Sequence, residues 1–136
     1  MYTIKYINDW SDAIVKVFIS QPMGGISYEE IIKKREEAEQ KIKLQFYNEK
    51  IEIISGISKN TKNISTISCL GEAIKAMADA DIVCFIGNWR QHRGCLIEYE
   101  VARSYGLSIY LENDPRKDGK LFKREEVSLF DMRSQL

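Results

Sequence analysis

Cysteine, proline and histidine are scarce in this sequence, and neither sign of charge is in excess. It has three cysteines, two prolines and one histidine, and its 20 basic and 20 acidic residues cancel to a net charge of zero. An odd number of cysteines predicts no disulfide framework, and one histidine with scattered cysteines predicts no metal site. A neutral chain does not bind nucleic acid through bulk charge. We therefore expect a reduced, cytoplasmic protein with no cofactor, no metal and no nucleic-acid polymer as its partner.

Long apolar runs are missing too. No run approaches the roughly 18 residues of a membrane span, and the first residues, Met1 to Lys5, lack the pattern of a signal peptide. The 136 residues are 44% apolar and 29% charged, which is the composition of one ordinary globular domain. We expect a single domain over 1–136 that has no membrane partner.

Strand-like and helix-like segments alternate along the chain. Short β-branched and apolar runs predict strands at 14–20, 50–55, 81–86 and 107–111. Helical spacing predicts helices from Ser27 to about 46, at 70–80 and at 94–105, with Gly106 as the C-cap of the last one. A loop is expected over 57–68, and at most a weak helix near 125–132. Strands that alternate with helices are typical of a parallel sheet covered on both faces, which is a three-layer α/β fold.

In such a sheet, ligands bind beyond the carboxyl ends of the strands. Two loops are expected there, at 21–26 and 87–93. The glycines in Gln21-Pro22-Met23-Gly24-Gly25 would let backbone amides approach a ligand, with a helix N-terminus beyond them. The segment has neither the dinucleotide-binding nor the P-loop glycine pattern. A plain tight turn is the alternative.

The segment 94–106 carries a carboxylate on its apolar side. At about 100° per residue, Glu98 falls in the middle of a broad apolar face. The members of that face are Cys95, Ile97, Val101, Ala102 and Tyr105. Position in the first helical turn favours the ionised form of Glu98, which suits a nucleophile or a stabiliser of a cation. The alternative is an ion pair with Arg93 or Arg35 that merely holds the fold together.

Two further readings of the second loop stay open. Trp89 would either stack on a ring of the ligand or pack over the edge of the sheet. His92 and Cys95 allow a nucleophilic cysteine, since a thiol at a helix start has a lowered pKa. Only one histidine supports that second reading.

These segments together resemble the nucleoside 2-deoxyribosyltransferase-like superfamily, above all its small bacterial and phage members. The matching residues are Lys16 to Gly25, Ala80-Asp81, Trp89, Arg93-Gly94-Cys95, Glu98 and Ala102. The resemblance covers a core of about 14–112 and leaves 113–136 as a C-terminal extension. It implies a flavodoxin-like or Rossmann-like fold, as in the related enzymes that hydrolyse deoxynucleoside monophosphates.

The resemblance also implies an activity. Family glutamates attack the anomeric carbon of a nucleoside, release the base and hold the sugar covalently until a second base or water takes it; Glu98 stands at that position. The implied substrate-binding residues are Ser20, Gln21, Met23, Gly24, Gly25, Asp81, Trp89, His92, Arg93 and Gly94. Among them, Asp81 would support the base or sugar, Trp89 would cover the base, and Gly24, Gly25 and Arg93 would hold the 5′ end. Related pockets are completed by a neighbouring subunit, which implies a homo-oligomer.

Two departures from the family pattern put the substrate in doubt. Phe18 stands where many transferases carry a tyrosine that orients the glutamate, and His92 stands where many carry an aspartate that contacts the sugar. An enzyme that cleaves or exchanges the base of a nucleoside or its 5′-monophosphate is the first hypothesis. A nucleotide-binding module without catalysis is the second. A partner-binding domain with Glu98 as an ion-pair residue is the third.

Overall fold

The structure is a computed structural model, and it describes residues 13–54, 66–112 and 121–125. Most of the predicted loop at 57–68, and nearly all of the weak helix predicted near 125–132, lie outside these residues. Most of the extension at 113–136 lies outside them as well. Within the described ranges, no helix has the length and apolar character needed to cross a membrane.

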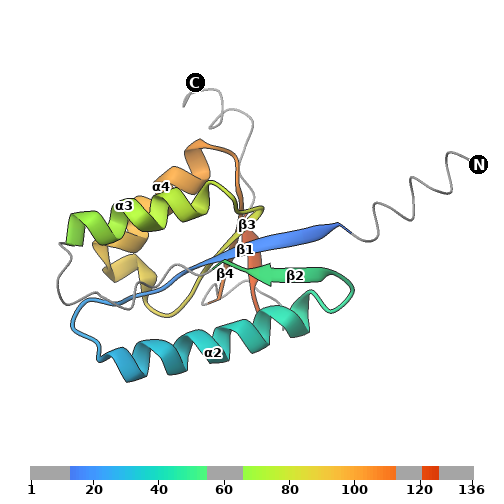
Figure 1. Cartoon of the computed structure of the whole chain (residues 1–136), viewed down its shortest axis with the longest axis horizontal. Coiled ribbons are helices and arrows are strands. Elements are labelled where there is room, and N and C mark those ends of the chain that lie inside the picture. Colours follow the sequence, from blue (N-terminus) through green and yellow to red (C-terminus); the bar gives the residue numbers. More distant parts are fainter. Residues whose placement is uncertain (1–12, 55–65, 113–120, 126–136) are drawn as a thin grey trace, which may run out of the picture.

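A five-stranded sheet forms the centre of the molecule (Figure 1). Its strands are β1 (Ile14–Ser20), β2 (Lys50–Ile53), β3 (Ile82–Phe85), β4 (Ser108–Leu111) and β5 (Lys123–Glu125), in the order β2-β1-β3-β4-β5. The first four strands run parallel, as predicted, and β5 pairs antiparallel with β4. No strand was expected at β5, because three charged residues carry no apolar periodicity.

Helices cover both faces of the sheet (Figure 1). The helix α2 (Tyr28–Gln45) lies on one face, and α3 (Thr66–Met77) and α4 (Arg93–Ser104) lie on the other. A short 3-10 helix, η1 (Trp89–Gln91), connects β3 to α4. The predicted three-layer α/β fold is confirmed. Helix α3 begins at Thr66, four residues before the predicted start at 70. The prediction missed this first turn because the turn shows no apolar repeat.

The alternation of side chains along β1 determines which face of the sheet each residue at its carboxyl end serves. Val17 and Ile19 pack in the core under α2, whereas Phe18 packs in the core under α3 and α4. The same alternation sends Ser20 toward α4 and Gln21 toward α2. Ser20 accordingly donates to a side chain of α4, and Gln21 donates to a backbone carbonyl of α2. Two neighbouring polar residues thus serve opposite faces of the sheet.

Helix α2 begins where the sequence indicates. The Ser27 hydroxyl accepts a hydrogen bond from the Glu30 backbone N–H at 3.3 Å, which caps the helix. The buried apolar residues of α2 are Ile31, Ala38 and Ile42. The helical spacing of the sequence also places Tyr28 on this apolar side, but Tyr28 is 45% exposed, so the buried stripe begins at Ile31.

Candidate functional site

A cavity of about 710 Å³ opens at the carboxyl edge of the sheet, between the loop after β1, helix α3 and the start of α4. We name it the Glu98 cavity. Seven of the residues predicted to form the site line it: Gln21, Met23, Gly24, His92, Arg93, Gly94 and Glu98. The fold thus brings together two loops that lie some seventy residues apart in the sequence.

Two predicted residues lie just beside this cavity. Ser20 is completely buried and stands behind Glu98, so it contacts the carboxylate rather than a ligand. Gly25 lies in a turn closed by a 3.2 Å hydrogen bond from the Ile26 N–H to the Met23 carbonyl. Its φ of 75° is a left-handed conformation that favours glycine, so Gly25 shapes the loop without lining the cavity.

Asp81 is not where the predicted role requires it. The residue directly precedes β3, so it stands at the amino edge of the sheet, opposite the cavity. Its carboxylate accepts a hydrogen bond from the Lys16 N–H at 2.8 Å, and its own N–H donates to the Lys16 carbonyl at 2.8 Å. The expected contact with a base or sugar is therefore wrong, and Asp81 instead ties β3 to β1.

Trp89 is a core residue. It is 3% exposed, and its ring packs 4.9 Å from that of Phe85 and 5.1 Å from that of Tyr99, measured between centroids. The Arg90 guanidinium lies 4.4 Å from the centre of the indole ring. Trp89 does not line the Glu98 cavity, so the proposed stacking on a base is wrong and the packing alternative holds.

Glu98 lies on the inward face of α4, as the helical wheel predicts. It is 7% exposed, and its Oε2 accepts a hydrogen bond from the Ser20 hydroxyl at 3.3 Å. Burial raises the pKa of Glu98 to about 7, and the hydrogen bond from Ser20 offsets part of that effect. The expectation that helix position favours the ionised form is therefore corrected: α4 begins at Arg93, so Glu98 lies beyond its first turn, and loss of water dominates.

The ion-pair alternative for Glu98 does not agree with the arrangement of the cations. Arg35 is buried as its position in the sequence suggests, but its guanidinium donates to the Ile54 carbonyl at 2.7 Å and lies 3.5 Å from the Glu39 carboxylate. Arg93 borders the same cavity as Glu98 without pairing with it. Among the described residues, Glu98 has no ion pair.

Cys95 lies one turn before Glu98 and is equally buried. Burial raises the pKa of its thiol to about 11; a hydrogen bond with Ser20 lowers it and the nearby charge of Glu98 raises it further. The thiol is therefore protonated at neutral pH. Burial raises the thiol pKa more than the helix start lowers it, which disfavours the reading of Cys95 as an activated nucleophile.

Helix α3 supplies a wall of the cavity that sequence reasoning missed. Its lining residues include Cys69, Leu70 and Glu72. The sequence carried a partial signal, since Leu70 was expected to point inward, but the late predicted start of the helix hid the rest. Glu72 gives the cavity a second carboxylate. Within the described ranges, no three His, Cys, Asp or Glu side chains gather as a metal site would require.

The fold and the cavity define a three-layer α/β domain with a buried carboxylate at the carboxyl edge of its parallel strands. The chain belongs to the family described as "Domain of unknown function (DUF4406)", which matches residues 15–111. Its fold is similar to that in the crystal structure of a conserved protein from Enterococcus faecalis V583, with a TM-score of 0.54 and 12% identity. The likeness covers 79% of this chain and 69% of that one and concerns the fold alone. No curated protein matches the chain.

Proposed function

We propose that the protein cleaves or exchanges the N-glycosidic bond of a nucleoside or its 5′-monophosphate, with Glu98 as the nucleophile. The observation that carries the proposal is a buried carboxylate that faces a large cavity and has one hydrogen bond among the described residues. Carboxylates that keep the fold together are normally paired or fully hydrogen-bonded. A carboxylate that keeps a raised pKa in a cavity is a candidate for catalysis.

The reaction follows from the chemistry of the carboxylate. A Glu98 oxygen would attack the anomeric carbon as the bond from that carbon to the base nitrogen breaks, and the departing base would take the electron pair and a proton from solvent water. The sugar would then be bound to Glu98 as an ester. Water or a second base would attack the same carbon, give up a proton to solvent and release the carboxylate. The burial of Glu98 would strengthen the attraction between the carboxylate and the cationic sugar in both transition states.

The entrance of the cavity offers groups for the other end of the substrate. Arg93 opens α4, where free backbone N–H groups and the helix dipole favour an anion. Gly24 lies on the loop opposite, without a side chain to obstruct the approach. A 5′-phosphate held between them would sit at the same cavity as the Glu98 carboxylate.

The test is base release measured by liquid chromatography. Wild type and Glu98→Gln are incubated with nucleosides, deoxynucleosides, their 5′-monophosphates and NAD, each with and without a free acceptor base. We expect release from at least one substrate and a loss of at least about 10³-fold in Glu98→Gln. Glu100→Gln is the matched control, because Glu100 lies on the exposed side of the same helix and pairs with Arg103. Undiminished release by Glu98→Gln would refute the role of Glu98.

A nucleotide-binding module of the same fold is the second candidate. The favouring observation is Phe18, which is buried in the core and gives Glu98 no aromatic hydroxyl. A protein that only binds would keep a nucleotide through purification and leave it unchanged after long incubation. Mass spectrometry of the denatured protein's supernatant separates the two candidates.

A further inference from the structure

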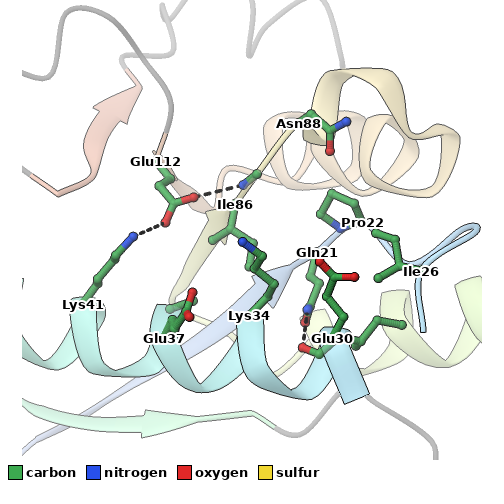
Figure 2. A pocket seen from close by; sticks show the side chains of 13 residues that line it. Gln21, Pro22, Ile26, Glu30, Lys34, Glu37, Lys41, Ile86, Asn88 and Glu112 are labelled. Atoms are coloured by element: carbon green, nitrogen blue, oxygen red, sulfur yellow. Dashed lines mark hydrogen bonds and ion pairs between the residues drawn. The ribbon is translucent and has the colours of Figure 1, made fainter. Parts of the chain in front are cut away.

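A second cavity lies on the other side of the strand ends, over α2 (Figure 2). We name it the α2 cavity; it has a volume of about 310 Å³, and it is lined by one face of α2, the start of the loop after β1 and the loop after β3. Its apolar floor includes Ile31, Ala38 and Ile86, all of them buried. A hollow of this volume takes a small organic molecule rather than a single water.

Gln21 forms part of the wall between the two cavities. The residue is 5% exposed, and its amide nitrogen donates to the Ile31 carbonyl at 2.7 Å, which fixes the orientation of the amide. Its Oε1 is buried and, among the described residues, has no hydrogen-bond donor. Because this oxygen has almost no accessible surface, Gln21 gives the cavity its shape, and the rim must supply the polar contacts of a ligand.

The rim carries charges of both signs that are not paired with one another. Figure 2 shows the side chains of Glu30, Lys34 and Glu37 rising from α2 at the cavity. None of the three has a side-chain hydrogen bond or ion pair within the part of the chain that the structure describes. Lys41 differs, since it pairs with Glu112 at 3.2 Å. Two carboxylates and one ammonium therefore remain available to a ligand.

From these groups we propose that the α2 cavity binds a small aliphatic zwitterion, a molecule with an ammonium at one end and a carboxylate at the other. The ligand's ammonium meets the Glu30 or Glu37 carboxylate. Lys34 meets the ligand's carboxylate. The methylene chain between them covers the apolar floor. The α2 cavity shares Gln21 and Pro22 with the Glu98 cavity, but the proposal uses none of the glycosidic chemistry and does not rest on it.

The test compares three probes that differ only in charge: 4-aminobutanoate, butylamine and butanoate. Each is titrated into the full-length ¹⁵N-labelled chain while backbone amide shifts are recorded by NMR. We expect saturable shifts at Gln21, Gly87 and Asn88 with 4-aminobutanoate, and a Kd at least fivefold lower than that of either other probe. Equal binding of butylamine would overturn the zwitterion, and no saturable shift with any probe would overturn the site.

Variants assign the binding to the two rim charges. Lys34→Gln and Glu37→Gln should each weaken 4-aminobutanoate at least fivefold. Lys33→Gln and Glu36→Gln are the matched controls, because they remove the same charges from neighbouring exposed positions that do not line the cavity. Equal losses in the controls would mean that general charge, not the cavity, attracts the probe. All four positions are exposed, so the variants should fold, and their amide spectra report this directly.

Discussion

Two carboxylates stand at the same edge of the sheet and differ in how they are satisfied. Glu112 directly follows β4; its two oxygens accept hydrogen bonds from the Gly87 N–H at 3.0 Å and from Lys41 at 3.2 Å (Figure 2). It thereby joins the ends of β4 and β3 to α2. Glu98 is more deeply buried, yet among the described residues it has a single hydrogen-bond partner, the hydroxyl of Ser20.

The difference separates a carboxylate that stabilises the fold from one that destabilises it. Glu112 has exchanged water for a backbone amide and an ammonium, so its charge is compensated. Glu98 has lost water and gained one hydroxyl donor, and this is why its pKa is raised. Groups of the second kind persist where a ligand or a reaction needs them, at a cost in stability.

The largest expected effect is on the stability of Glu98→Gln. The carboxyl pKa is about 7 in the folded protein against an ordinary 4.5, so the folded state holds an extra proton between these values. Stability therefore falls as pH rises from about 4.5 to 7 and stays low above that range. Glu98→Gln should gain on the order of 3 kcal/mol at pH 8 and nothing below pH 4.5. Urea unfolding of wild type and variant at pH 8 and below pH 4.5 measures the difference in the free energy of unfolding under each condition. If Glu98→Gln were less stable than wild type at pH 8, Glu98 would stabilise the fold as Glu112 does, and the proposed difference between them would be wrong.

The same chemical change at Glu112 should have the opposite sign. Glu112→Gln keeps an oxygen for the Gly87 N–H but sets an uncharged amide beside Lys41. Because the lysine is 44% exposed, solvent screens the pair, and we expect a loss of only about 1 kcal/mol. Urea unfolding at pH 8, in parallel with Glu98→Gln, gives the direct comparison. Stabilisation of both variants would show that the edge of the sheet disfavours any carboxylate.

Much of this arrangement could be predicted from periodicity. The first strand was predicted at its observed bounds, and the wheel placed Glu98 on the inward face of its helix. Such patterns are local, and a chain of this size expresses them faithfully in burial. The same wheel also placed Tyr105 inward, although it is 81% exposed, because the helix ends before that residue.

What the sequence could not predict depends on contacts between distant residues. Asp81 and Trp89 were assigned to the ligand because of their chemistry. Their partners lie elsewhere in the chain: Lys16 precedes Asp81 by 65 residues, and Tyr99 follows Trp89 by ten residues. The balance between burial and helix position at Glu98 likewise depends on how completely α3 and α4 exclude water. Local pattern carries neither kind of information.

The smallest expected effect concerns Ser20, the one donor that distinguishes Glu98 from a wholly unpartnered carboxylate. Because the hydroxyl stabilises the charged form, Ser20→Ala should raise the pKa of Glu98 by up to about one unit. Ser20→Thr, which keeps a hydroxyl, should restore it. NMR titration of the side-chain carboxyl measures the pKa without any need for activity. Ser27→Ala removes a hydroxyl that caps α2 and should leave the titration of Glu98 unchanged. If base release occurs, the acidic limb of its pH profile should move by the same amount. A pKa of Glu98 that is unchanged in Ser20→Ala would mean that burial alone sets the charge of Glu98.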